Sequence, residues 1–240
     1  MKITKPLVQK IIELTNHGLV KGVGRPEAGK MCVEACVCFA LGLPHGDDPK
    51  CVGAAVRSFK ITLNDQNWSS DKARGEGLKR IAIAQLGSDQ LDQKEFAERI
   101  CKKGINQLLP KLFRYLAERK DCKEPEKFLA HAEQCEKASG IKECREAAKS
   151  AFASAYAYAY ASAYAYASAY AYASAAAGAF ASAYAFASAY ASAAAGADVK
   201  KHFGQDYFLK LTADMACQVL IEMKSPGCEW LFLCDEKEAE

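Results

Sequence analysis

Apolar residues recur three and four positions apart along most of residues 1–150, a spacing that predicts a series of amphipathic helices. The first predicted helix is capped by Thr4 and ends at Gly18. The second covers residues 27–41 and ends at Gly42, because glycine accommodates the left-handed backbone that follows many helices. The pattern indicates helical structure from the start of the chain.

Capping residues predict where the next helices begin. Asp48 followed by Pro49 is typical of the cap and first turn of a third helix. Ser69 or Ser70 predicts the cap of a fourth helix. The polar residues around Trp68, which precede that cap, predict a loop in which the tryptophan is the packing anchor.

Glycine and acidic residues affect where the fourth and fifth predicted helices begin and end. Gly75 and Gly77 weaken the opening turns of the fourth helix, because glycine is a poor helix former. Asp92, with Glu95 three residues later, resembles a capping box and predicts a fifth helix, which Gly104 interrupts.

Further amphipathic helices are predicted from about residues 108 and 125 and over residues 208–223, whereas residues 230–234 are predicted to be extended. The predicted fold class is therefore all-α. Three parts are expected: a cysteine-rich helical head (1–140), one very long alanine-rich helix or helical hairpin (141–198), and a C-terminal helix with a short extended tail (199–240).

Residues 151–197 carry alanine at every odd-numbered position, which is formally the period of a strand. We nevertheless predict a helix, because 26 of these 47 residues are alanine, the strongest helix former. Residues 171–179 recur identically at 189–197, and this shift of 18 residues corresponds to about five helical turns. The repeated small residues therefore share one face of the predicted helix.

The second half of this predicted helix has two different faces. Small residues fall within an arc of about 120°, namely Ser174, Gly178, Ser182, Ser188, Ser192 and Gly196. Aromatic residues fall on the opposite side, namely Phe180, Tyr184, Phe186 and Tyr190. The small residues permit close approach of another helix, and the rings offer apolar area. These ten residues, on two opposite faces, are the predicted packing and oligomerisation residues.

An unbroken helix of 47 residues is about 70 Å long, whereas a compact chain of 240 residues has a radius of gyration of roughly 18 Å. The segment must therefore bend back near Gly178 or pack against other copies of the chain. We favour the second arrangement, because a glycine flanked by alanines is a weak turn signal. The predicted state is a homo-oligomer.

Charge narrows the classes of partner. The formal net charge is +3, and all 61 charged side chains lie on the 193 residues outside 151–197. Acidic and basic residues alternate there without a basic block, so nucleic acid is not an expected partner. The uncharged segment is long enough to span a bilayer, but it contains no Leu, Ile or Val, which disfavours membrane insertion.

Eleven cysteines are many for a chain of 240 residues. No secretory leader is evident, so we expect reduced thiols in the cytoplasm, packed as small buried apolar groups. Cys32 and Cys36, and likewise His131 and Cys135, are four residues apart and could meet at zinc. Because no close CxxC pair supports such a site, we predict no metal and no cofactor.

Two motifs could carry chemistry. Residues 24–30 have the spacing of a phosphate-binding loop, but Met31 replaces the magnesium-binding serine or threonine, so an ordinary loop is expected. Cys32 is the best candidate nucleophile, and His45 with Asp47 lies just beyond the predicted helix end; His131 or His202 is the alternative base. A helix of about 10 residues separates its ends by about 15 Å, which favours a structural role for Cys32.

Four stretches and the alanine alternation together carry a resemblance. The stretches are residues 29–48 (GKMCVEACVCFALGLPHGDD), 60–70 (KITLNDQNWSS), 84–88 (AQLGS) and 221–230 (IEMKSPGCEW). They resemble uncharacterised bacterial or phage proteins that place an alanine-rich repeat before a short helical tail. The resemblance covers most of the chain and implies a common architecture, without implying a substrate.

The leading hypothesis is a structural or self-assembly protein that homo-oligomerises through residues 151–197. The alternatives are a cysteine-dependent enzyme that uses Cys32, which is the less favoured reading, and a membrane-active protein that inserts the uncharged segment.

Overall fold

A computed structural model of the chain describes residues 2–120, 122–140, 142–144, 146–147, 150 and 201–235. In chain order the elements are α1 (Lys5–Asn16), α2 (Val33–Ala40), α3 (Ala54–Asn64), α4 (Asp71–Ala84), the 3-10 turn η1 (Ser88–Gln90), α5 (Gln93–Lys103), the π-helical turn η2 (Gly104–Leu108), α6 (Leu109–Glu118), α7 (Pro125–Lys137), α12 (Tyr207–Glu222) and the 3-10 helix η4 (Pro226–Cys234). The described residues contain no β-sheet, and the predicted all-α fold class is confirmed. The long helix predicted over residues 151–197, with both of its faces, lies outside the described residues.

The chain divides into two units. The first consists of Met1–Phe96 together with Gly204–Glu240, and the second consists of Ala97–Phe203. The first unit is therefore built from both ends of the sequence.

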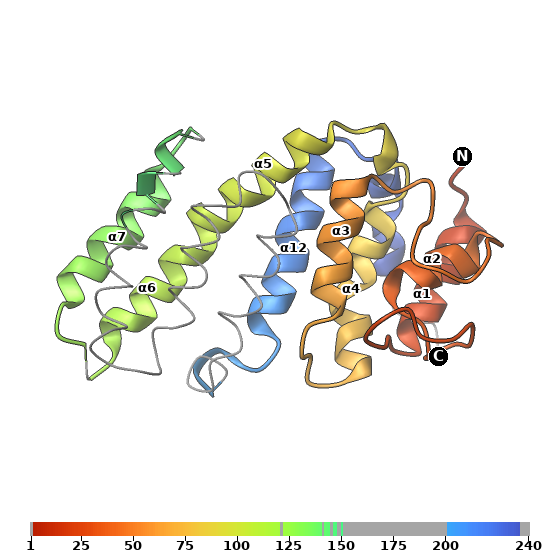
Figure 1. Cartoon of the computed structure of the whole chain (residues 1–240), viewed down its shortest axis with the longest axis horizontal. Helices are drawn as coiled ribbons and strands as arrows, with labels where there is room; N and C mark the ends of the chain where they lie inside the picture. Colours follow the sequence, from red (N-terminus) through yellow and green to blue (C-terminus); the bar gives the residue numbers. More distant parts are fainter. Residues whose placement is uncertain are drawn as a thin grey trace. The chain divides into compact units, whose positions relative to one another are not determined.

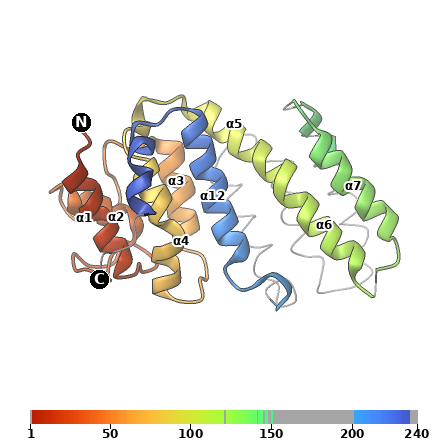
Figure 2. The same cartoon turned by 180° about the vertical axis from the view of Figure 1, so that it is seen from behind.

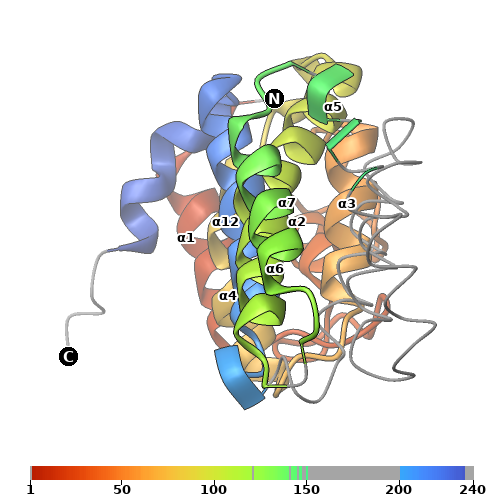
Figure 3. The same cartoon turned by 90° about the vertical axis from the view of Figure 1, so that its left-hand side faces the viewer.

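α4 is the central helix of the first unit. It packs against α1, α2, α12 and η4, and Figures 1 and 2 show α4 and α12 side by side. η4 also packs against α1, as Figure 3 shows. The buried face of α4 carries Leu78, Ile81 and Ile83, so the apolar stripe of this helix forms the core of the unit.

Two glycines allow close packing around the start of α4. A Cβ atom on Gly75 would lie 2.2 Å from the backbone oxygen of Thr15 in α1. A Cβ atom on Gly77 would lie 2.4 Å from the ring of Trp68, which is buried and donates its indole N–H to the Leu63 carbonyl at 3.0 Å. The glycines that weaken the sequence signal for this helix thus bring its neighbours into contact.

Several predicted helix starts are confirmed. Ser70 caps α4, its hydroxyl accepting the Ala73 N–H at 3.0 Å. Asp92 caps α5, its carboxylate accepting the N–H groups of Lys94 and Glu95 at 2.8 and 3.0 Å. The predicted interruption at Gly104 is instead a π-helical turn that leads directly into α6.

The second helix begins later than predicted, at Val33 rather than at residue 27. Residues 24–31 form a closed hairpin instead, with an antiparallel bridge between Gly24 and Met31. Within it the Arg25 N–H donates to the Lys30 carbonyl at 2.7 Å. The hairpin provides hydrogen-bond partners for backbone groups that the sequence predicts in the first turn of a helix.

Two other predicted elements are wrong. Asp48 and Pro49 do not open α3, which starts at Ala54, because the Pro49 carbonyl accepts the Val52 N–H in a separate turn. Residues 230–234 are not extended, since they belong to the 3-10 helix η4, whose apolar residues pack against α4 without forming a strand pair.

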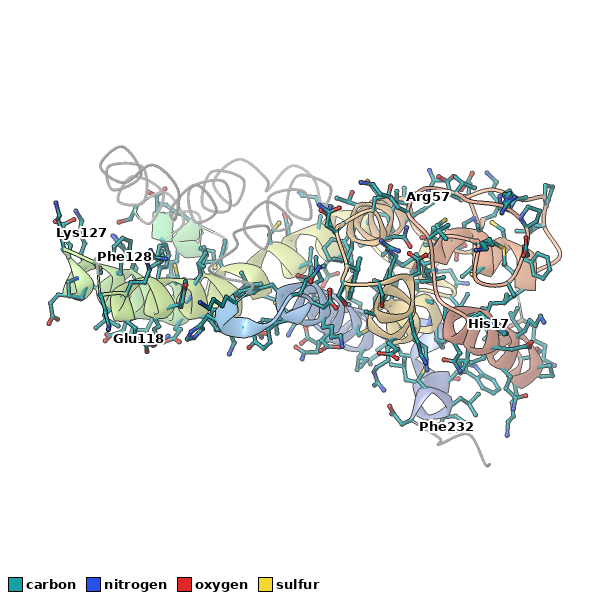
Figure 4. The ribbon with its side chains drawn as sticks, turned by 90° about the horizontal axis from the view of Figure 1, so that it is seen from below. His17, Arg57, Glu118, Lys127, Phe128 and Phe232 are labelled. Atoms are coloured by element: carbon teal, nitrogen blue, oxygen red, sulfur yellow. The ribbon has the colours of Figure 1, made fainter. Side chains whose placement is uncertain are left out.

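In the second unit, α6 and α7 form an antiparallel pair. Phe113 and Phe128 stack with ring centroids 6.0 Å apart. Asn106 of η2 donates to the Cys135 carbonyl at 2.6 Å. Figure 4 shows Glu118 and Lys127 at the end of the pair where the chain turns from α6 to α7.

Candidate functional site

The candidate nucleophile Cys32 is the N-cap residue of α2. Its sulfur accepts the Ala35 N–H at 3.4 Å, and only 4% of the residue is exposed. Burial raises the pKa of the Cys32 thiol, although the backbone N–H groups of Ala35 and Glu34 oppose this effect. The thiol is therefore protonated at neutral pH, which is the weakly nucleophilic form.

The two residues proposed to assist Cys32 make other contacts. His45 is exposed, and its Nε2 lies 3.1 Å from the Gly24 carbonyl. The carboxylate of Asp47 lies 3.9 Å from Arg57, which is at the surface of the first unit (Figure 4). The contacts of the Cys32, His45 and Asp47 side chains thus go to different partners, and these three side chains do not form a relay.

A cluster that the sequence pattern does not predict lies close to Cys32. It consists of Glu34 on α2, Lys60 on α3 and Gln85 at the C-cap of α4, and all three side chains are buried. Lys60 Nζ lies 3.0 Å from Glu34 Oε1, and Gln85 Nε2 donates to Glu34 Oε2 at 3.2 Å. We name this group the buried charge cluster.

The buried charge cluster is incompletely hydrogen-bonded. Lys60 Nζ and Glu34 Oε1 are within ion-pair distance, but neither atom has a well-directed hydrogen bond, and Gln85 Oε1 has none either. A charged group that is buried and incompletely paired is costly to the folded state. The free-energy cost of burying these groups distinguishes the cluster from the apolar side chains of the core.

The electrostatics of the cluster follow from its burial. Burial raises the pKa of Glu34 to about 7, with Lys60 opposing the shift, and burial lowers the pKa of Lys60, with Glu34 opposing that shift. Both shifts favour the neutral form of each group.

The thiols near the cluster are also protonated. Burial raises the pKa of Cys36 to about 12 and that of Cys38 to about 11, and it raises the pKa of Cys51. All three behave as the small buried core groups expected from the sequence.

A second polar network positions the start of α2 and hence the cluster. The side-chain oxygen of Asn64 accepts the Val33 N–H at 3.3 Å, and its amide donates to the Val20 carbonyl at 2.9 Å. Arg74 of α4 donates to the carbonyls of Asn64 and Leu19 at 2.8 and 2.7 Å. The loop before α2 is thereby tied to both α3 and α4.

The spacing of residues 24–30 does not produce a phosphate cradle. The N–H groups of Arg25, Glu27 and Lys30 donate to carbonyls inside the hairpin at 2.7 to 2.9 Å. These groups therefore do not converge on a common point, as the amides of a phosphate-binding loop do. The expectation of an ordinary loop agrees with this geometry, although the loop closes on itself before the helix starts.

The described residues do not contain a group of three or more His, Cys, Asp and Glu side chains arranged to hold a metal. The candidate zinc pairs lie in different units, with Cys32 and Cys36 in the first and His131 and Cys135 in the second. Across the part of the chain that the structure describes, the helices also lack the length and hydropathy needed to cross a membrane.

Glu34 and Lys60 carry a signal that could have revealed them. Glu34 is the only charged residue in the apolar run from Met31 to Leu41, and Lys60 stands between Phe59 and Ile61. An isolated charge in an apolar helical run indicates either a solvated edge or a buried pair. Pairing two such residues across different helices requires the tertiary structure.

Comparison of the chain with protein-family models, with curated proteins and with solved structures gives no match.

Proposed function

We propose that this protein is a self-assembling structural protein, in which helical units are joined to a homo-oligomer by residues 151–197. One observation carries the proposal. Twelve of the 24 aromatic residues of the chain lie in these 47 residues, which contain no charged side chain. Rings at this density need apolar partners, because exposed contiguous apolar surface is unfavourable in water.

The flanks of the segment support this reading. Described residues on both sides of it belong to the second unit. On one side Cys144 and Ala147 are buried, and on the other side the His202 and Phe203 rings pack on Tyr115 at centroid distances of 4.6 and 5.4 Å. These packed residues can serve as anchors for a segment that mediates assembly.

The chemistry around Cys32 gives less support to the enzyme alternative. A nucleophilic cysteine needs an accessible thiolate and a base within hydrogen-bond reach. Cys32 is buried with a raised pKa, and His45 bonds to Gly24 instead.

The test is the mass of the full-length protein in solution, measured by light scattering after size-exclusion chromatography. A multiple of the 26.1 kDa chain mass is expected at micromolar concentration. A monomer at every concentration tested contradicts the proposal. Flotation with liposomes tests the membrane-active alternative, and an oligomer that floats with lipid favours that alternative instead.

Two variants locate the interface. The aromatic variant replaces Phe180, Tyr184, Phe186 and Tyr190 with alanine. Each ring contributes about 1.5 kcal/mol or more of burial, so the dissociation constant should rise at least 100-fold. The control variant replaces Ser174, Ser182, Ser188 and Ser192 with alanine, which keeps the small face small, and it should remain oligomeric. Equal behaviour of the two variants rules out the aromatic face as the interface.

A further inference from the structure

The buried charge cluster joins three helices at one point in the first unit. Glu34 belongs to α2, Lys60 to α3 and Gln85 to the end of α4, and their contacts are 3.0 and 3.2 Å long. A change in the charge of Glu34 therefore alters the contacts that join α2 to α3 and to α4. None of the functions considered above uses this cluster.

Gln85 can serve both protonation states of Glu34. Its Nε2 now donates to Glu34 Oε2, while its Oε1 is buried without a hydrogen-bond partner. A side-chain amide carries a donor and an acceptor that exchange places when the terminal group turns by half a rotation. After that rotation, Oε1 faces Glu34 and can accept a hydrogen bond from a protonated carboxyl.

We propose that the buried charge cluster is a proton-binding site, in which Glu34 takes up one proton from solvent and Gln85 turns its amide to accept the resulting O–H. The proton adds to the Glu34 carboxylate, and no other covalent bond changes. Lys60 then loses its counter-ion, so the attraction that holds α2 to α3 weakens while the contact from α2 to α4 is kept. The site makes the packing of these helices depend on pH.

Several titratable and charged groups surround the cluster. Lys60 and Arg57 of α3 and Asp47 of the preceding loop act on Glu34. The thiols around the pair interact with Glu34 or Lys60, namely Cys32, Cys36, Cys38 and Cys51. No titratable group is found among the side chains that α1 buries, which are Val8, Ile11, Leu14 and Thr15. On α4 the buried charge of Arg74 is bonded to Asp71 and to backbone carbonyls. The pKa of Glu34, which burial raises to about 7, brings the titration of this carboxyl near neutral pH.

The sign of the effect on stability follows from the shift of Glu34. The ordinary pKa of glutamate is 4.5, and that of Glu34 in the folded state is about 7. Between these values the folded chain holds a proton that the unfolded chain has released, so stability falls as pH rises through this window. The unfolding constant should rise by up to about tenfold per pH unit, relative to a variant without this carboxyl.

The direct experiment is an NMR titration of the full-length protein labelled with 13C in glutamate and 15N in glutamine. The Glu34 carboxyl resonance is identified by its loss in Glu34→Gln, and Glu13→Gln, at an exposed position, is the matched control. If Glu34→Gln does not fold, sequential assignment of the wild-type protein identifies the resonance. Glu34 should titrate near pH 7, and the Gln85 side-chain amide should shift with the same midpoint.

Two results overturn the proposal. The first is a Glu34 resonance that titrates with the exposed glutamates, because the cluster then binds no proton near neutral pH. The second is a Gln85 amide that stays constant while Glu34 titrates, because Gln85 then does not respond to the proton. Urea unfolding from pH 4.5 to pH 7 provides an independent check, since the pH dependence just described must disappear in Glu34→Gln but persist in Glu13→Gln.

Discussion

Removing one member of the Glu34–Lys60 pair should be far more damaging than replacing both. At 3.0 Å and an effective dielectric constant of about 20, the attraction between the two charges is about 5 to 6 kcal/mol. Taking two charges out of water costs several kcal/mol for each ion, so the net contribution of the pair is close to zero. The single variant Lys60→Met leaves the Glu34 carboxylate buried without its counter-ion.

We therefore expect Lys60→Met to lower the free energy of unfolding by about 3 to 5 kcal/mol at pH 8, because the folded chain must then hold Glu34 either as an unpaired carboxylate or with a proton that the unfolded chain does not bind. The double variant Glu34→Gln with Lys60→Met keeps an acceptor for Gln85, and it should lie within about 1 kcal/mol of the wild type or above it. Urea unfolding followed by circular dichroism measures both values. A double variant that is as unstable as Lys60→Met would refute the reasoning, because the loss would then come from packing and not from charge.

Three further changes test other parts of the structure. Gly75→Ala should destabilise the first unit by about 1 to 3 kcal/mol, because its Cβ would lie 2.2 Å from the Thr15 backbone oxygen; urea unfolding measures this. Arg74→Met should cost about 2 to 3 kcal/mol, because two buried carbonyls lose their donor, and faster amide exchange around Leu19 should accompany it. A thiol-reactive probe at neutral pH should label Cys32 more slowly than the half-buried Cys228, as followed by mass spectrometry.

Each of these three predictions has a control variant or a result that would contradict it. Gly140→Ala, where a Cβ meets nothing within 4 Å, should change stability little, and an equal loss at both glycines would refute the steric argument. Arg114→Met removes an exposed ion pair with Glu136 and should cost less than about 1 kcal/mol. Cys32 labelling ahead of the half-buried thiols would restore the enzyme hypothesis.

The sequence predicts local features of this fold well and tertiary ones poorly. The caps at Ser70 and Asp92 were predictable, because the side chain and the N–H group it accepts are within three residues of one another. Pro49 was misleading, because a proline suits a turn as well as a first helical turn, and only the contacts around Gly53 decide between them.

The candidate site shows the same division. The sequence favours a buried Cys32, and the thiol is buried, whereas no sequence pattern predicts its proximity to Glu34 and Lys60. The two charges are 26 positions apart and on different helices, so no periodicity within either helix connects them. Gly75 and Gly77 similarly predict a weak start of α4, because helix propensity carries no information about a neighbour that needs the space.

The division of the first unit between the two ends of the sequence has a consequence for biosynthesis. Asp206, which precedes α12, binds the N–H and the hydroxyl of Ser69, 137 positions earlier. During synthesis, the face of α4 that packs on α12 and η4 therefore lacks these partners until more than one hundred further residues have been made. During that interval an apolar helix face is open to solvent, which is the condition under which nascent chains aggregate or recruit chaperones. Moving residues 204–235 to the amino terminus by circular permutation would shorten that exposure.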